Sequence, residues 1–422
     1  MHCTQRRTNA SFMLALVSLI PGVAMAQGGS WTTKASMPTP RVTVAGAQVN
    51  GVVYAIGGYN TFGILSSNEA YDPATDTWST KAAMPTARYV LAAAAVNGIV
   101  YAIGGNPGGY IVSTVEAYDP VTNTWSTKAS MPTLRSTLAA VEVNGILYAI
   151  GGNDYSGILD TVEAYDPTTD TWSTKAAMPT ARSEAAAVEV NGIIYAIGGY
   201  NARAGLLATV EAYDPTTDTW STKAAMPAVQ YESAAAVVNG IVYIIGGNSN
   251  ATPGGNLNTV QAYDPTTDTW STKAAMPTAR SGLAAVEVKG TVYAIGGAIY
   301  GDNIEYPTNE AFTPTPACQV AIGGASANPS VLWPPNHQLV NVTVDYTATD
   351  PCGATCSLSV AGSGGSASDW SVVDAHHVLL RAERAGNGGG RTYTITITCS
   401  DTSSSASVPV TVSVPHDQGH DG

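Results

Sequence analysis

The chain has 422 residues, with 43 Gly and 24 Pro but only 12% charged residues. That length exceeds the need of one ordinary core, and the composition favours short strands joined by tight turns, so we expect an all-β protein of more than one domain. The net charge of −13 and the pI near 4.7 argue against a nucleic-acid partner, because phosphate binding relies on clustered Lys and Arg.

The first 26 residues have the pattern of a signal peptide. Arg6 and Arg7 precede an apolar run over residues 11–23, and Ala24-Met25-Ala26 follows as a small-x-small cleavage site. No later segment approaches the roughly 20 apolar residues that a membrane-spanning helix needs. We therefore predict export, a mature chain that begins at Gln27, and a secreted, cell-surface or periplasmic location without a transmembrane segment.

Internal repeats dominate the sequence from residue 30 to residue 314. Two markers recur at intervals of 47 to 50 residues: a Gly-Gly pair, first at Gly57-Gly58, and a Trp, first at Trp31. Each repeat is typical of four strands, and in the second repeat we expect them at residues 89–96, 99–103, 114–118 and 124–128. Asn97-Gly98 lies between the first two and favours a tight hairpin, because both central residues of a type I′ turn need a positive φ.

Gly-Gly, Tyr-Asp-Pro and Thr-Trp at these intervals resemble the kelch repeat, whose families fold as β-propellers with one four-stranded sheet per repeat. The resemblance implies a six-bladed kelch β-propeller over residues 27–314. Trp31 has no first three strands before it, and the last repeat ends at Phe312 without a following Trp. We therefore expect the N-terminal strand to complete the last blade, and the Trp side chains to pack between neighbouring blades.

Variation gathers on one predicted face of the propeller. The loops that follow the Gly-Gly pairs hold 12, 12, 12, 13, 15 and 14 residues, and they share a face with the entries to the first strands. In kelch propellers that bind peptides, Arg and Ser at those entries line the axial pocket. The resemblance thus implies a ligand site at this face. We add Tyr231, which replaces the Ser in the fifth repeat, and two exceptional Glu. The candidate set is Arg88, Arg135, Ser136, Arg182, Ser183, Glu184, Tyr231, Glu232, Arg280 and Ser281.

The Arg residues also have a purely structural interpretation, in which they bind no ligand and only hydrogen-bond the loops of neighbouring blades. An enzyme is constrained further, because no His or Cys lies between Gln27 and Ala317. That excludes a copper site like that of galactose oxidase and any Cys or His nucleophile pair. Glu184 and Glu232 could still act as acid and base on a sugar, as in kelch-like bacterial sialic acid epimerases. We assign no catalytic residue, cofactor or metal.

The last segment, residues 315–422, predicts a small β-sandwich. Alternating apolar residues occur at 339–346, 356–360, 378–381, 392–398 and 408–414. The stretches 333–337, 379–384 and 414–418 resemble an immunoglobulin-like module of secreted bacterial proteins. Four Cys lie here, and two disulfides in any of three pairings are expected among Cys318, Cys352, Cys356 and Cys399. Adjacent His376 and His377 would point to opposite faces of a strand, so we expect no metal site there.

These observations favour an exported binding or adaptor protein that uses one propeller face to bind a glycan or a peptide. The alternative is a carbohydrate-modifying enzyme, epimerase-like or mutarotase-like, with Glu and Arg at the propeller mouth. A structural component of an extracellular envelope is a third interpretation. The oligomeric state and the ligand stay open at this stage.

Overall fold

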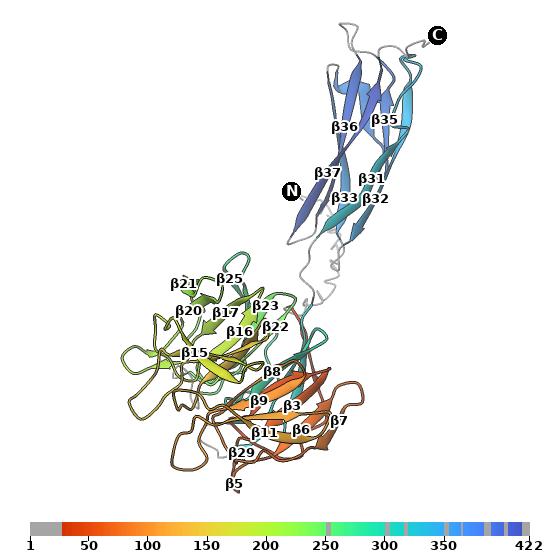
Figure 1. Ribbon diagram of the computed structural model, residues 1–422. Coiled ribbons are helices and arrows are strands. Elements are labelled where there is room, and N and C mark those ends of the chain that lie inside the picture. The colour runs from red at the N-terminus through yellow and green to blue at the C-terminus, as the bar shows by residue number, and fades with distance from the viewer. Residues whose placement is uncertain are drawn as a thin grey trace, which may run out of the picture. The chain divides into compact units, whose positions relative to one another are not determined.

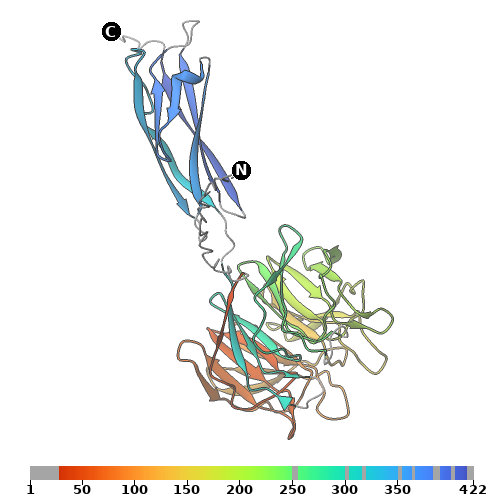
Figure 2. The same cartoon turned by 180° about the vertical axis from the view of Figure 1, so that it is seen from behind.

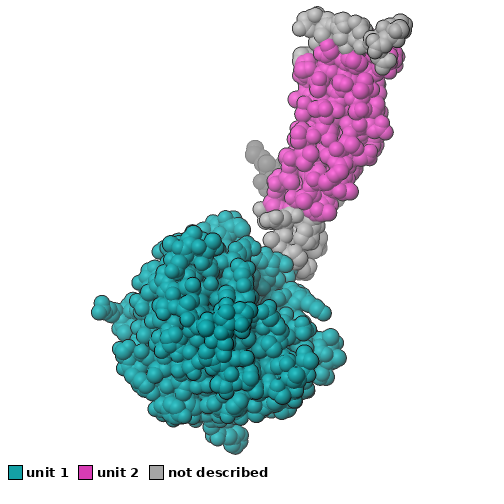
Figure 3. Space-filling model, viewed as in Figure 1, with its two compact units in different colours: residues 1–315 teal, residues 316–422 magenta. Residues whose placement is uncertain are grey.

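The computed structural model describes residues 28–249, 255–299, 304–315, 320–349, 354–363, 366–383, 390–400 and 404–415. The chain divides into two compact units, residues 1–315 and residues 316–422 (Figure 3). The predicted signal peptide lies outside the described residues. No helix in the described part of the chain is long and apolar enough to cross a membrane.

Unit 1 contains six four-stranded antiparallel sheets among its described residues, here called sheets 1 to 6 (Figure 1). Sheets 1 to 3 are β2 (Ala45–Val49), β3 (Val52–Ile56), β6 (Asn68–Asp72) and β7 (Thr77–Thr80); β8 (Ala92–Val96), β9 (Ile99–Ile103), β10 (Val115–Asp119) and β11 (Thr124–Lys128); and β12 (Ala139–Val143), β13 (Ile146–Ile150), β14 (Val162–Asp166) and β15 (Thr171–Lys175). Sheets 4 and 5 are β16 (Ala186–Val190), β17 (Ile193–Ile197), β20 (Val210–Asp214) and β21 (Thr219–Lys223); and β22 (Ala234–Val238), β23 (Ile241–Ile245), β24 (Val260–Asp264) and β25 (Thr269–Lys273).

Sheet 6 joins the two ends of unit 1. Its strands are β26 (Ala284–Val288), β27 (Thr291–Ile295), β30 (Asn309–Thr313) and β1 (Ser30–Thr33), and β1 pairs with β30 so that Trp31 lies opposite Phe312. The two aromatic rings are 5.1 Å apart. The expectation that the N-terminal strand completes the last sheet is therefore confirmed.

The first strands of the six sheets form a closed ring. Each contacts the first strand of the next sheet, and β26 contacts β2. Each hydrophobic cluster of unit 1 draws its buried residues from two neighbouring sheets, as with Ile103 of sheet 2 and Leu147 of sheet 3. Because a single sheet buries its apolar face only against its neighbours, the ring has no sheet that is stable alone.

Local sequence explains the shape of each sheet. Asn97 and Gly98 both have positive φ, 51° and 81°, as the predicted type I′ hairpin requires. The first Gly of the pair after each second strand lies against the entry to the next sheet. A Cβ on Gly151 would lie 2.4 Å from the carbonyl oxygen of Arg182, so only glycine fits at this close approach.

Neighbouring sheets are joined by two hydrogen bonds at their outer strands. In sheet 3, the indole Nε1 of Trp172 donates to the carbonyl of Ala129, which follows sheet 2. The amide of Ala129 donates to the carboxylate of Asp170, which also accepts a hydrogen bond from the hydroxyl of Tyr165. The prediction that the Trp side chains pack between neighbouring sheets is thus confirmed, and the connection is polar as well as apolar.

Three further hairpins extend the loops that follow the Gly-Gly pairs. Each has two short strands, and their bounds are β4 (Tyr59–Asn60) with β5 (Gly63–Ile64), β18 (Tyr200–Asn201) with β19 (Gly205–Leu206), and β28 (Ala298–Ile299) with β29 (Ile304–Glu305). The ribbons of unit 1, seen from two opposite sides, show the four-stranded sheets and the loops that extend beyond their ends (Figures 1 and 2).

Unit 2 contains two sheets that enclose one core. They are built from β31 (Ala321–Asn328), β32 (Leu339–Thr349), β35 (His377–Arg381) and β34 (Trp370–Val372), and from β33 (Thr355–Gly362), β36 (Arg391–Ser400) and β37 (Ser405–Val414), with a short 3₁₀ helix η1 (Ala367–Asp369). The core combines both sheets, with Val342 and Leu380 from one and Ile395 and Val412 from the other. All five alternating segments predicted from the sequence lie in strands.

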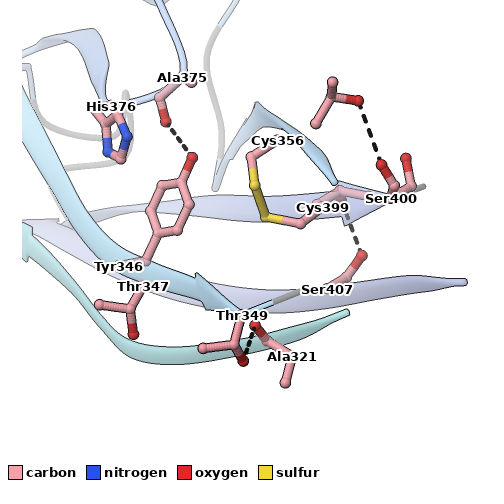
Figure 4. The surroundings of a disulfide bond; sticks show 12 residues. Ala321, Tyr346, Thr347, Thr349, Cys356, Ala375, His376, Cys399, Ser400 and Ser407 are labelled. Carbon is pink, nitrogen blue, oxygen red and sulfur yellow. Dashed lines mark hydrogen bonds between the residues drawn. A yellow bond between two sulfur atoms is a disulfide. The ribbon is translucent and has the colours of Figure 1, made fainter. Parts of the chain in front are cut away.

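A disulfide joins the beginning of β33 to the last part of β36, with Cys356 second in β33 and Cys399 next to last in β36. Cys356 and Cys399 are direct partners in the strand register, with Cα atoms 4.0 Å apart (Figure 4). Nearby, the ring of His376 stacks on Tyr346 at 4.6 Å, and Tyr346 donates its hydroxyl hydrogen to the carbonyl of Ala375. Cys318, Cys352 and the histidines of the C-terminal tail lie outside the described residues.

Candidate functional site

The Arg at the entries to the first strands are fully buried and do not face a ligand site. In sheet 4, Arg182 is 1% exposed and forms an ion pair of 2.7 Å with Glu211 of β20. Its guanidinium also donates to the carbonyls of Gly198 and Thr209. The same ion pair recurs in four other sheets, as Arg41–Glu69, Arg88–Glu116, Arg135–Glu163 and Arg280–Glu310.

The assignment of Arg88, Arg135, Arg182 and Arg280 to ligand binding is therefore wrong. A guanidinium that has no exposed surface, and whose donors reach groups inside the protein, cannot contact a ligand. Burial lowers the pKa of Arg182, and the attraction of Glu211 only partly offsets this effect. The structural interpretation holds, although the partner is a Glu and loop carbonyls of the same sheet.

Sheet 5 shows the same arrangement in neutral form. Gln230 replaces the Arg, Gln261 replaces the Glu, and Ala228 replaces the Thr whose hydroxyl donates to that Glu in the other sheets. Gln230 is 1% exposed and donates to the hydroxyl of Thr259. Both charged residues of a buried ion pair have to be replaced together, because removing one charge leaves the other uncompensated. The Thr that donates to the Glu is replaced as well.

The Ser candidates are buried beside the ring entries. Ser136 donates its hydroxyl hydrogen to the side chain of Asn153, and Ser183 and Ser281 are 7% and 3% exposed. Tyr231 pairs through its backbone with Asn248 in sheet 5. These three Ser expose little surface, and their role in ligand binding stays a prediction, as does that of Tyr231.

The next residue in each entry lies at the ring axis, and here the structure brings both predicted Glu together. Five of these axial residues donate a backbone hydrogen bond to the carbonyl of the axial residue in the preceding sheet. The amide of Glu184 donates to Thr137 at 3.0 Å, and the amide of Glu232 donates to Glu184 at 3.3 Å. The six residues line one cavity of about 150 Å³, and they are Thr43, Val90, Thr137, Glu184, Glu232 and Gly282.

The surroundings of this axial cavity raise the pKa of both carboxyls. Loss of hydration on burial, together with the nearby charge of Glu232, raises the pKa of Glu184 to about 7. Burial also raises the pKa of Glu232, although a hydrogen bond from Ser281 opposes this shift. The wall beyond the Glu is largely apolar and includes Leu91 and Leu138, which explains the poor hydration.

The axial residues also have strained backbones. Glu184 and Glu232 have φ of 54° and 50°, and the β-branched Val90 and Thr137 have 48° and 52°. Such residues avoid the left-handed region at a cost of about 1–3 kcal/mol each, and strain of this kind clusters at functional sites. The ring of amide-to-carbonyl hydrogen bonds holds these residues in place.

Around the cavity, the loops after the Gly-Gly pairs expose aromatic side chains that the sequence analysis missed. Among the described residues of unit 1, the exposed large apolar side chains are Tyr59, Phe62, Tyr110, Tyr155 and Tyr200 in these loops and Val121 elsewhere. The signal in the sequence was an aromatic residue next to Gly, Asn or Asp in a loop with few charged residues. Each loop begins beside the ring, since Tyr59 pairs with Val42 and Tyr200 with Ser183.

Comparison with known proteins concerns unit 1. The family described as the KLHDC2/KLHL20/DRC7 Kelch-repeats domain matches residues 23–177 and 127–297, which together span more than half of the chain. A solved structure titled "Structure of YjhT" is similar with a TM-score of 0.59 and 18% identity, over 67% of this chain and 97% of that chain. At this identity the likeness shows the fold alone. No curated protein matches.

Proposed function

Because the chain belongs to the kelch-repeat family, we propose that it is an exported binding or adaptor protein built on a six-bladed kelch β-propeller, each of sheets 1 to 6 being one blade. Kelch propellers generally mediate binding. The ligand, a glycan or a peptide, would bind at the face that carries the axial cavity and the loops after the Gly-Gly pairs.

One observation carries this proposal: Glu184 and Glu232, the two exceptional residues of the repeat, meet in one strained ring at the mouth of a cavity. A repeat that served only stability would have no need of two desolvated carboxyls at its axis, because each has a raised pKa and so destabilises the folded state at neutral pH. Costs of this kind are typical of binding and catalytic sites.

The remaining parts of the chain fit an exported protein. Disulfides such as Cys356–Cys399 persist in oxidising compartments outside the cytosol. We propose that residues 1–26 are a signal peptide, and that residues 315–422 form an immunoglobulin-like sandwich that acts as a spacer or attachment module. A second disulfide between Cys318 and Cys352 would follow if the two remaining Cys pair.

A carbohydrate-modifying enzyme is the second candidate, and the pKa of Glu184 favours it. A carboxyl with a pKa of about 7 can both donate and accept a proton near neutral pH, and Glu232 is close enough to influence it. The buried Arg cannot assist, so this enzyme would have to work with the two Glu and the hydroxyls of Thr43 and Thr137.

The test is a glycan and peptide array screen of the exported protein, followed by the variant Glu184→Gln. A binding protein should keep most of its affinity in this variant. An enzyme that depends on the carboxyl should still bind its substrate but lose turnover. Absence of any ligand from both arrays would contradict the proposed function.

A further inference from the structure

The loops of sheets 1, 2 and 3 are joined into one surface. The rings of Tyr59 in sheet 1 and Tyr89 in sheet 2 lie 5.9 Å apart. The hydroxyl of Tyr155 in sheet 3 accepts a hydrogen bond from the amide of Ile111 in sheet 2, at 2.8 Å. Three segments far apart in the sequence thus form a continuous surface, here called the aromatic platform.

The aromatic residues at the loop tips have no role in the core. Phe62 is 96% exposed, Tyr155 is 69% exposed and Tyr110 is 54% exposed. Large exposed apolar side chains that gather on one face of a soluble protein mark a contact site for a ligand. Val121 is the exposed large apolar side chain of the described unit 1 that lies outside these loops, at the opposite end of sheet 2 in the turn between β10 and β11.

The tips are held in place before any ligand arrives. The side chain of Asn60 accepts a hydrogen bond from the amide of Phe62 and donates to the carbonyl of Pro40. Asn106 accepts from the amide of Gly108, and Asp154 accepts from the amide of Ser156. Because these turns are already ordered, binding loses little conformational entropy.

The charge of the platform limits the ligand. In a chain with a net charge of −13, the loops over residues 59–67 and 106–114 carry no charged side chain at all. Arg and Lys, which a polyanion would need, are absent from the loop over residues 153–161 as well, where the charged side chains are Asp154 and Asp160. The surface therefore suits an uncharged ligand and repels an anionic one.

The pattern of the side chains favours a carbohydrate over a protein. Each exposed ring has a small or polar neighbour, such as Thr61, Gly109 or Ser156, and the apolar residues that follow it in each loop are partly buried. The exposed apolar surface therefore lacks the broad contiguous core that protein interfaces bury. A sugar ring offers a face of C–H groups, which the negative face of an aromatic ring attracts, and a rim of hydroxyls for polar neighbours. Rings supplied by three successive sheets can contact successive sugars of a chain.

We propose that the aromatic platform, formed by the loops of sheets 1, 2 and 3 around Phe62, Tyr110 and Tyr155, binds a neutral polysaccharide by stacking. This inference rests on the proposed binding function and names its ligand class. The axial cavity would lie next to the bound chain, because each loop of the platform begins beside the axial ring.

The experiment is affinity electrophoresis of the full exported chain in native gels that contain a neutral polysaccharide, such as a galactomannan, a xyloglucan or hydroxyethyl cellulose, or an anionic one, polygalacturonate. Retardation by at least one neutral polymer and none by polygalacturonate is expected. Phe62→Ala and Tyr110→Ala should each weaken binding about 3-fold to 10-fold, as the loss of one aromatic contact predicts. Phe62→Tyr should keep most of the affinity.

Val121→Ala is the matched control, since it removes an exposed apolar side chain away from the platform and should leave polysaccharide binding unchanged. Equal melting temperatures would show that the variants fold. The inference is overturned if only polygalacturonate retards the protein, if no neutral polymer does, or if the Phe62 and Tyr110 variants migrate like the parent. A peptide ligand that depends on Glu184 but not on Phe62 would overturn the platform and leave the proposed function standing.

Discussion

At the scale of single residues, the buried Arg–Glu pairs invert the expected role of the Arg. Arg182 has its partners inside sheet 4, so its loss acts on folding before it acts on any ligand. Sheet 5 provides an internal reference, because its neutral Gln230 and Gln261 occupy the same positions. The same buried position in the repeat is thus filled by an ion pair in five sheets and by two neutral side chains in sheet 5.

We predict that Arg182→Ala lowers the free energy of unfolding by about 3–5 kcal/mol, because it leaves Glu211 buried without a counter-charge. The double variant Arg182→Gln/Glu211→Gln, which copies sheet 5, should recover most of this loss. Urea denaturation of both proteins measures the difference. Equal stability of Arg182→Ala and the parent would show that the ion pair does not hold the sheet.

The carboxyl of Glu184 predicts a pH dependence of stability. Its pKa is about 7 in the folded protein and near its ordinary value of 4.5 when unfolded. The stabilisation from a raised pKa is fully present below pH 4.5 and is lost as the pH rises to about 7. Glu184→Gln should therefore stabilise the protein at pH 8 by about 1–3 kcal/mol and flatten this part of the profile.

Denaturant unfolding of the parent and of Glu184→Gln between pH 4.5 and pH 8 is the measurement. Glu232 also has a raised pKa, so part of the dependence should persist in the single variant. Glu189→Gln is a control, since Glu189 lies in β16 and its carboxylate accepts a hydrogen bond from the amide of Gly192 in the following hairpin turn. A steeper loss of stability above pH 5 in Glu184→Gln would contradict the assignment.

At the scale of elements, stability depends on the seams between sheets, meaning the hydrogen bonds that join the outer strands of neighbouring sheets. In each of five seams, the residue before the outer strand accepts both a Tyr hydroxyl and an amide of the preceding sheet; four of these residues are Asp, and Asn123 fills the position in sheet 2. The seam therefore requires a side-chain oxygen that accepts both hydrogen bonds, and it does not require the negative charge of a carboxylate. Positive φ at this position, 54° for both Asp170 and Asn123, also suits Asp and Asn best.

We predict that Asp170→Ala destabilises unit 1 by about 2–4 kcal/mol, through two lost hydrogen bonds and the strain of Ala at positive φ. Asp170→Asn should stay within about 1 kcal/mol of the parent, as Asn123 performs the same role in sheet 2. Thermal and urea unfolding report both values. A larger loss in the Asn variant than in the Ala variant would mean that charge, and not hydrogen-bond geometry, stabilises the seam.

At the scale of the whole molecule, ring closure decides whether the sheets act together. Strand β1 supplies the fourth strand of sheet 6, and Trp31 covers Phe312 and donates to the carbonyl of Ala274. Deletion of residues 28–34 should therefore lower the melting temperature of unit 1 by about 10 °C, because it removes a strand and a large aromatic contact. Differential scanning calorimetry tests this, and an unchanged transition of unit 1 would refute the closure argument.

The strands and the completion of sheet 6 by the N-terminal strand could be predicted from the repeat. The repeat period, the turn residues and the incomplete repeats at both ends are all visible in short stretches of sequence. The direction of a long side chain is not local. Arg182 occupies a fixed place in the repeat, but only its Glu211 partner, distant in sequence, shows that it turns inward. The coupled replacements in sheet 5 were the available signal. Glu184 and Glu232 could be predicted because they depart from their own repeat.

The pairing of β30 has a mechanical consequence for a chain that continues into a second unit at residue 316. Strand β30, the last of unit 1, lies between β27 and β1, so it is hydrogen-bonded along both sides. Tension applied through unit 2 reaches unit 1 at Thr313 and must break both ladders, whereas a strand at a sheet edge would peel away from one. Strand β1 thus holds β30 in sheet 6, so that unit 1 resists unfolding by a force applied at its C-terminal end.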